Sequence, residues 1–128
     1  MILLRDKYYR LLASDIADGA GTFKISIIDT CDVFNGHFPG HPICPGVFNV
    51  QTLKECCADV LSADITFVSI KQCRFLSVIE PKSEPSAPVY TVKVSTTVAG
   101  DGVYGIKASI EDDTQTYLSF DGKAQVKA

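Results

Sequence analysis

The sequence predicts an α+β domain in which a curved, mostly antiparallel sheet packs around one long helix. Residues 46–63 place apolar side chains at helical spacing with no proline among them, which predicts that helix. The chain beyond it is rich in Ile, Val, Thr and Phe and is divided by short turns, which is typical of strands. The length of 128 residues and the apolar fraction of 46% indicate one domain, residues 1–128, with a single core.

The N-terminal third is expected to contain a short helix and a strand. Four apolar side chains within residues 3–13 share one helical face: Leu4, Tyr8, Leu11 and Leu12. From Gly21 to Ile28, apolar and polar residues alternate, which predicts a half-buried strand. The stretch from Phe34 to Gly46 holds three glycines and three prolines, so we expect an irregular but stiff segment there. Pro45 then suits the start of the long helix.

Four more strands are expected in the C-terminal half, at residues 65–75, 89–98, 103–110 and 116–126. The sequences Gly-Asp-Gly at 100–102 and Glu-Asp-Asp at 111–113 supply turns between the last three. Short connections of this kind join antiparallel neighbours, so these three strands are expected to form a meander. The whole domain should then hold five or six strands.

Composition excludes several classes of function. The net charge of −3 argues against sequence-independent binding of nucleic acid. No apolar run approaches the length that spans a bilayer, and the early charges in MILLRDKYYR do not fit a signal peptide. The five cysteines are odd in number, include the adjacent Cys56 and Cys57, and form no CxxC pair. We therefore expect free thiols, no metal site and a cytoplasmic location.

Both histidines, His37 and His41, lie in the stiff segment. Pro39 and Pro42 exclude the helix that would make them a pair of metal ligands. Two interpretations remain: loop residues satisfied by backbone or water, or a general base with a pKa near neutrality. The helix that begins at Gly46 offers free N–H groups that can polarise a carbonyl. A base close in sequence to such donors suits abstraction of a proton α to a carbonyl.

Residues 36–47, GHFPGHPICPGV, closely resemble the signature of the 3-hydroxyacyl-[acyl carrier protein] dehydratases, which have the hotdog fold. Residues 71–75, KQCRF, resemble that family's KxxRF strand, although Lys82 stands where the following turn usually has glycine. Residues 4–12 also resemble the family's opening segment around a Tyr and a Leu pair. Together these segments span most of the chain in the expected order.

The resemblance implies an antiparallel sheet around a central helix, and a homodimer or higher oligomer with its active site between subunits. It implies reversible dehydration of (3R)-3-hydroxyacyl thioesters to trans-2-enoyl thioesters in fatty-acid, lipid or polyketide biosynthesis. His37 would remove the C2 proton and the amide of Gly46 would hold the thioester carbonyl. Val47, Phe38 and Pro39 would contact the substrate. The acyl group would arrive on the phosphopantetheine of an acyl carrier protein or coenzyme A, with no metal or other cofactor.

One position departs from the family. The acidic residue that serves the leaving hydroxyl corresponds to Gln51, and an amide cannot give up a proton at neutral pH. Glu55 lies four residues later on the same helix face. We hypothesise that the two are exchanged, with Glu55 supplying the carboxylate directly or through Gln51; the alternative is a solvated helix glutamate. The departure also leaves open an acyl thioesterase, or a catalytically impaired subunit that pairs with a competent homologue.

Overall fold

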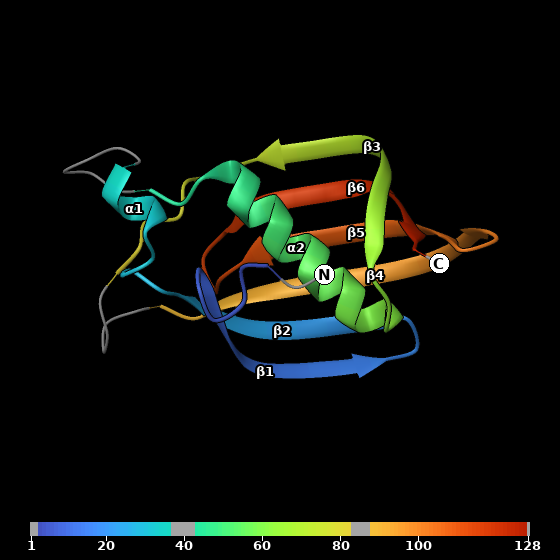
Figure 1. Ribbon diagram of the computed structural model, residues 1–128, viewed down its shortest axis with the longest axis horizontal. Coiled ribbons are helices and arrows are strands. Elements are labelled where there is room, and N and C mark those ends of the chain that lie inside the picture. Colours follow the sequence, from blue (N-terminus) through green and yellow to red (C-terminus); the bar gives the residue numbers. More distant parts are fainter. Residues whose placement is uncertain (1–2, 37–42, 83–87, 128) are drawn as a thin grey trace.

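The computed structural model describes residues 3–36, 43–82 and 88–127. Its strands form one antiparallel sheet in the order β1-β2-β4-β5-β6-β3, and the long helix α2 crosses one face of that sheet (Figure 1). The strands are β1 Tyr9–Ala17, β2 Ala20–Ile27, β3 Ile65–Phe75, β4 Tyr90–Gly100, β5 Val103–Glu111 and β6 Thr116–Val126. The helices are α1 Val33–Gly36 and α2 Gly46–Leu61. The predicted α+β class and its sheet around one long helix are confirmed.

The central helix and five of the predicted strands lie where the sequence indicates. Strands β4, β5 and β6 are antiparallel neighbours, as the short turns between them predict. A helix of one turn, α1, lies at the start of the Pro- and Gly-rich segment, where the sequence predicted an irregular backbone. None of the helices that the structure describes has the length and apolar character needed to cross a membrane.

The predicted N-terminal helix is wrong. Only one hydrogen-bonded turn forms, in which the Tyr8 N–H donates to the Leu4 carbonyl at 2.7 Å, and the left-handed φ of 68° at Asp6 within it excludes an α-helical turn. The chain then extends as β1, in which Tyr9 pairs with Ile27 of β2. The apolar spacing misled because β1 is an edge strand and most of its residues are exposed, so its alternation is weak.

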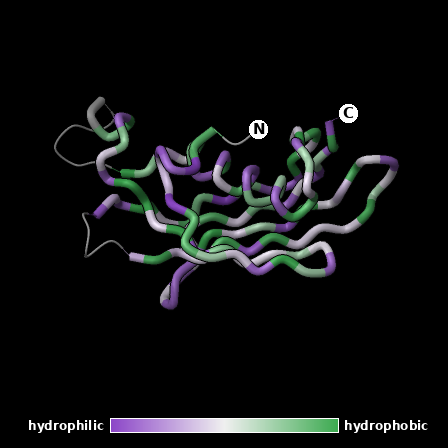
Figure 2. Tube along the Cα trace, turned by 60° about the horizontal axis from the view of Figure 1, so that its bottom comes forward, coloured by the Kyte–Doolittle hydropathy of each residue, from purple (hydrophilic) through white to green (hydrophobic). Residues whose placement is uncertain are grey.

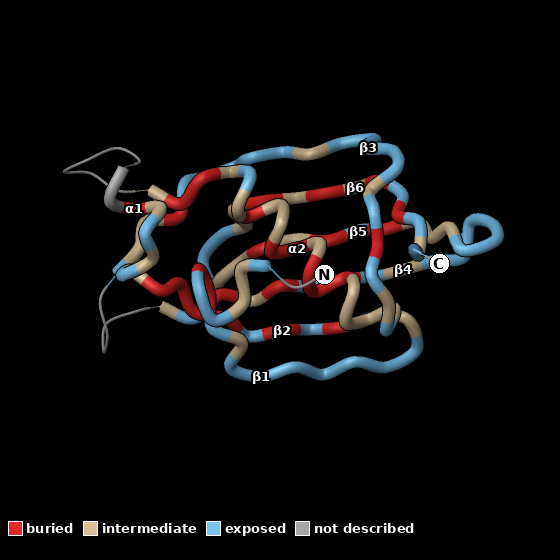
Figure 3. The backbone as a smooth tube through the Cα atoms, viewed as in Figure 1, coloured by how far each residue is buried: buried red, intermediate tan, exposed pale blue. Residues whose placement is uncertain are grey.

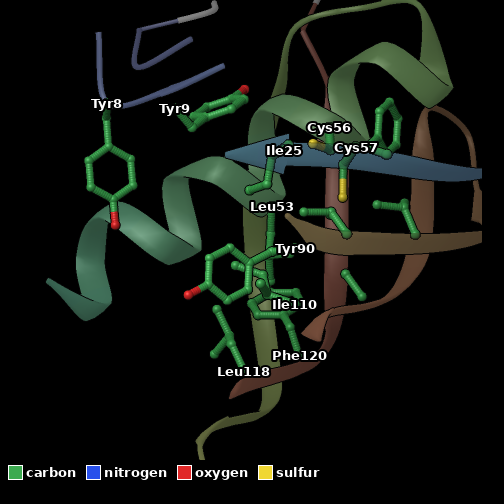
Figure 4. Packing of buried hydrophobic residues seen from close by; sticks show 14 of the residues in the cluster. Tyr8, Tyr9, Ile25, Leu53, Cys56, Cys57, Tyr90, Ile110, Leu118 and Phe120 are labelled. Carbon is green, nitrogen blue, oxygen red and sulfur yellow. The ribbon is translucent and has the colours of Figure 1, made fainter. Parts of the chain in front are cut away.

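The core lies between α2 and the sheet (Figure 3). Leu53, Cys56 and Cys57 are buried on the sheet-facing side of α2, and Figure 4 shows them among side chains of the strands such as Ile25 and Ile110. Fully burying a Leu stabilises a fold by about 1.5–3 kcal/mol. The hydropathy view shows apolar segments alternating with polar ones along the strands under the helix (Figure 2). This packing fixes α2 against the sheet and so fixes the position of its N-terminus.

Candidate active site

The N-terminus of α2 carries no side-chain cap. Pro45 occupies the N-cap position, makes no side-chain hydrogen bond there, and no acidic residue follows in the first turn. The Pro45 carbonyl accepts hydrogen bonds from the N–H groups of Phe48 and Asn49 at 3.1 and 3.2 Å. The positive end of the helix dipole is therefore not neutralised by a carboxylate of the helix's first turn, and it can attract a developing negative charge.

Contacts on both sides of Pro45 hold this helix end in place. The Cys44 N–H donates to the carbonyl of Ile79 at 2.7 Å. The buried Tyr8 hydroxyl donates to Oδ1 of Asn49 at 2.7 Å, and the Tyr8 ring packs edge-on against Phe48 with centroids 5.1 Å apart. Burial raises the pKa of the Cys44 thiol to about 11, partly offset by a hydrogen bond with Tyr8. Cys44 is thus a neutral packing residue at neutral pH.

Gly46 lies directly under the ring of Phe75 at the end of β3. A Cβ added at Gly46 would come within 2.7 Å of Cε1 of Phe75. Phe75 is 59% exposed and Val47 is 72% exposed, so the first turn of α2 opens to the surface of the single chain. The absent side chain lets an aromatic ring approach the backbone closely at the amide that was predicted to hold a carbonyl.

Glu55 is buried at 1% exposure and its carboxylate accepts five hydrogen bonds. Three come from the backbone N–H groups of residues 3, 4 and 5, at 2.9–3.1 Å. The Tyr9 hydroxyl gives the fourth at 2.9 Å, and Nε2 of Gln51 gives the fifth at 3.1 Å. The interpretation of Glu55 as a solvated helix glutamate is therefore wrong.

The structure brings Gln51 and Glu55 together on one face of α2, as their spacing predicts. Gln51 is half-buried, four residues nearer than Glu55 to the helix N-terminus. The direct contact fits the form of the hypothesis in which Glu55 acts through Gln51. A catalytic role for either residue stays a prediction.

A polar network that the sequence did not predict surrounds Glu55. The Arg5 guanidinium donates to Asp59 at 2.8 Å and to the Tyr9 hydroxyl at 3.2 Å. Burial alone would lower the pKa of Arg5, but the hydrogen bonds to Asp59 and Tyr9 raise it overall. Burial raises the pKa of Tyr9 well above its usual range. Two adjacent tyrosines close to an arginine were the only hint of this network in the sequence. The α2 residues that these three side chains contact lie about fifty positions further along the chain.

Several predicted site residues lie outside the described part of the chain: His37, Phe38 and Pro39, together with the secondary His41. Within the described ranges, no group of three or more His, Cys, Asp or Glu side chains could hold a metal ion.

A shallow hollow of about 610 Å³ lies over the sheet, away from the first turn of α2. Polar side chains from all six strands line it, including those of Lys93, Lys107 and Asp121. Among the described residues, neither Gly46 nor Gln51 borders it. This hollow is therefore separate from the candidate active site.

Comparisons with known proteins identify the family. The model of the ApeI-like family, described as ApeI dehydratase, matches residues 14–99, which is more than half of the chain. A 3-hydroxyacyl-[acyl-carrier-protein] dehydratase FabZ of Aliarcobacter butzleri is 31% identical over 115 residues, covering 75% of this chain and 76% of the relative. A FabZ of Fusobacterium nucleatum is 32% identical over 68 residues, covering 49% of this chain. That match spans only 46% of the Fusobacterium protein's own length.

Solved structures show the same fold. The dehydratase heterocomplex ApeI:P from Xenorhabdus doucetiae has a TM-score of 0.70 at 19% identity, covering 91% of this chain and 96% of that one. The PaaI protein of Escherichia coli, from the phenylacetic acid degradation operon, has a TM-score of 0.65 at 14% identity, covering 94% of this chain and 80% of that one. The predicted hotdog fold is therefore confirmed. By its fold and by its sequence match, this chain belongs to the ApeI-like dehydratase family.

Proposed function

We propose that the protein catalyses the reversible dehydration of (3R)-3-hydroxyacyl thioesters to trans-2-enoyl thioesters. The uncapped N-terminus of α2, which lies a few residues after the His-Phe-Pro-Gly segment in sequence, carries this proposal. A helix start without a side-chain cap and with glycine at its first position suits the binding of a thioester carbonyl. Membership of a dehydratase family and the similarity to FabZ support the same reaction.

In the proposed reaction, the amide of Gly46 binds the thioester carbonyl and so acidifies the C2 proton. His37 takes that proton, the C2–H electron pair becomes the C2=C3 double bond, and the C3–O bond breaks. The departing hydroxide takes up the proton from the imidazolium of His37, so water leaves and the base is restored. Gln51 and Glu55 serve the hydroxyl group as a pair. Phe38, Pro39 and Val47 contact the substrate.

The proposed substrate is an acyl chain on the phosphopantetheine arm of an acyl carrier protein or coenzyme A. The mechanism removes one proton and one hydroxide, which leave together as water, and the substrate is neither oxidised nor reduced overall, so it calls for no redox cofactor; the proposal includes no metal. The cysteines of the chain are free thiols, which suits a reducing compartment, and we propose a cytoplasmic role in fatty-acid or related lipid biosynthesis.

A homodimer is part of the proposal, and β3 is its proposed contact. This strand is at the edge of the sheet, so one row of its backbone groups has no partner strand in the described chain. Val68 and Ile70 of β3 are 49% and 57% exposed. An exposed apolar edge strand is a template for pairing with a second copy. Such pairing would also cover the region of Phe75, beside Gly46.

Ile70→Asp is expected to convert the protein to a monomer, because a charge on a pairing edge opposes strand addition. Val98→Asp is the matched control, since Val98 is 79% exposed on β4, away from the β3 edge. Analytical ultracentrifugation at equal concentrations measures both. The dimer through β3 is excluded if the Ile70 variant keeps the sedimentation coefficient of the Val98 variant.

Gly46→Ala is expected to lower kcat/KM for the thioester by about 10–100-fold, because the new methyl displaces the Phe75 ring beside the carbonyl-binding amide. The fold should tolerate it, since the half-exposed ring can move. Gly100→Ala is the control, because its Cβ meets only Val103, at 3.9 Å. Steady-state kinetics and melting temperatures measure both variants, and equal activity in the two would contradict a role for the Gly46 amide.

One assay tests the proposed function against its alternatives. The pure protein is incubated separately with 3-hydroxyacyl and trans-2-enoyl pantetheine thioesters, while absorbance of the enoyl thioester and release of free thiol are followed. Interconversion of the two thioesters without thiol release supports the dehydratase. Thiol release without interconversion indicates a thioesterase and rejects the proposal.

A second candidate is a subunit that is impaired alone and acts with a different partner. Gln51 favours this candidate, because an amide hydrogen-bonded to Glu55 stands at the position where the family has an acidic residue. The solved ApeI:P dehydratase is itself a heterocomplex. If the pure chain converts neither thioester, but adding a homologue with an acidic residue at the Gln51 position yields more activity than that homologue alone, this candidate replaces the first.

A further inference from the structure

We propose that Glu55 is a positioning residue, which turns the side chain of Gln51 so that its carbonyl oxygen is the atom presented to the substrate hydroxyl. This inference rests on the proposed function and deepens it, because it states what an amide does at a position where the family has an acid.

The hydrogen bonds of Glu55 divide between its two carboxylate oxygens. Oε1 accepts from the Arg5 N–H and the Tyr9 hydroxyl, at 3.1 and 2.9 Å. Oε2 accepts from the N–H groups of Leu3 and Leu4 and from Nε2 of Gln51, at 2.9–3.1 Å. A carboxylate has about four acceptor sites, and all five of these groups are donors. Glu55 is thus fully occupied as an acceptor, which leaves it no direct contact with a substrate.

The occupied carboxylate determines the orientation of the Gln51 amide. Glu55 offers only acceptor atoms, so the NH₂ group of Gln51 must face it; the reverse orientation would set oxygen against oxygen. The carbonyl Oε1 of Gln51 is then on the other arm of the amide, directed away from Glu55. The half-buried Gln51 therefore presents an acceptor, fixed by a charged partner that is itself held by five bonds.

An acceptor at this position has a defined use in the reaction. In dehydration, Oε1 of Gln51 accepts the hydrogen of the 3-hydroxyl and fixes the C3–O bond for departure. In hydration, the same oxygen accepts from the attacking water and aims its lone pair at C3. A carboxylate at the same position would also accept a hydrogen bond, so Gln51 keeps that half of the role and gives up proton transfer.

The orientation can be measured without any activity. In ¹H–¹⁵N spectra, the Gln51 side-chain amide is expected to show one proton shifted downfield and slow to exchange, because it is bonded to a carboxylate. Glu55→Gln should weaken that signature, because the charged acceptor becomes the neutral carbonyl of an amide. Tyr9→Phe is the matched control: it removes one bond to Oε1 of Glu55 and leaves the bond from Gln51 to Oε2. A Gln51 amide that exchanges freely in the wild type overturns the inference.

A kinetic cycle tests the use of that orientation. Gln51→Leu is expected to lower kcat about tenfold, which is the value of one ordinary hydrogen bond. Glu55→Gln should lower kcat by a similar factor. Because Glu55 acts only through Gln51, the double variant Gln51→Leu/Glu55→Gln should lower kcat no further than either single variant. For the same reason, the pH–rate profile of Glu55→Gln should keep the shape of the wild-type profile. Tyr9→Phe should lower the melting temperature while leaving kcat unchanged.

The two possible failures are distinguishable. If the wild type interconverts no thioester, the proposed function fails, and the Gln51 amide signal still decides whether Glu55 positions that side chain. If the wild type is active but the two single losses multiply in the double variant, or Glu55→Gln removes a limb of the pH profile, Glu55 transfers a proton itself. Either result overturns the inference and leaves the proposed function standing.

Discussion

His37→Ala is expected to lower the rate of enoyl-thioester hydration by about 10²–10⁴-fold, the usual contribution of a positioned general base. Hydration forms a bond between carbon and hydrogen at C2, and histidine is the residue type whose ordinary pKa suits that proton transfer near neutral pH. The chain has two histidines, His37 and His41. Loss of enoyl absorbance over time, at saturating substrate, measures the effect.

His41→Ala is the matched control, since it removes an imidazole from the same Pro- and Gly-rich segment of the sequence. Its variant is expected to keep most of the activity. If the two variants lose activity equally, or His41→Ala loses more, the assignment of the base to His37 is wrong. A melting curve for each variant separates loss of the base from loss of the fold.

Glu55→Ala is expected to lower the free energy of unfolding by about 3 kcal/mol, because it leaves one buried donor and four partly buried donors without their acceptor. The groups that would lose their acceptor are the N–H groups of residues 3–5, the Tyr9 hydroxyl and the Gln51 amide. The N-terminal segment would then lose its main attachment to α2. Urea unfolding followed by circular dichroism measures the change.

Asp59→Ala supplies the comparison for that loss. It removes the ion pair with Arg5 on the same helix, but both partners are partly exposed, so we expect a cost of about 1 kcal/mol or less. An equal cost for the two variants would show that the Glu55 carboxylate does not anchor the N-terminal segment.

The sequence predicts the elements whose signal is local. Helix α2 and strand β6 were expected within two residues of where they lie, because apolar periodicity along each segment reports directly the face that it buries. Strand β1 was missed because it is an edge strand: only Tyr9 along it is fully buried, and β2 rather than its own sequence makes it extended.

The surroundings of Glu55 could not be predicted from the sequence for a different reason. The spacing to Gln51 places the two side chains together, but burial of the carboxylate depends on the backbone of residues 3–5, about fifty positions away. The identity of a residue does not show whether its backbone N–H donates to a distant side chain. Any residue except proline could supply those N–H groups, so only the fold reveals that Glu55 is occupied.

Hydration of a trans-2-enoyl thioester in D₂O tests the central claim most directly, because the proton that reaches C2 must then come from the solvent-exchanged base. The account predicts that the wild type yields a 3-hydroxyacyl thioester with one deuterium at C2, seen by mass spectrometry, and that His37→Ala yields almost none. Recovery of the unchanged enoyl thioester from the pure wild-type protein, or of free thiol in place of the hydroxyacyl product, would contradict it.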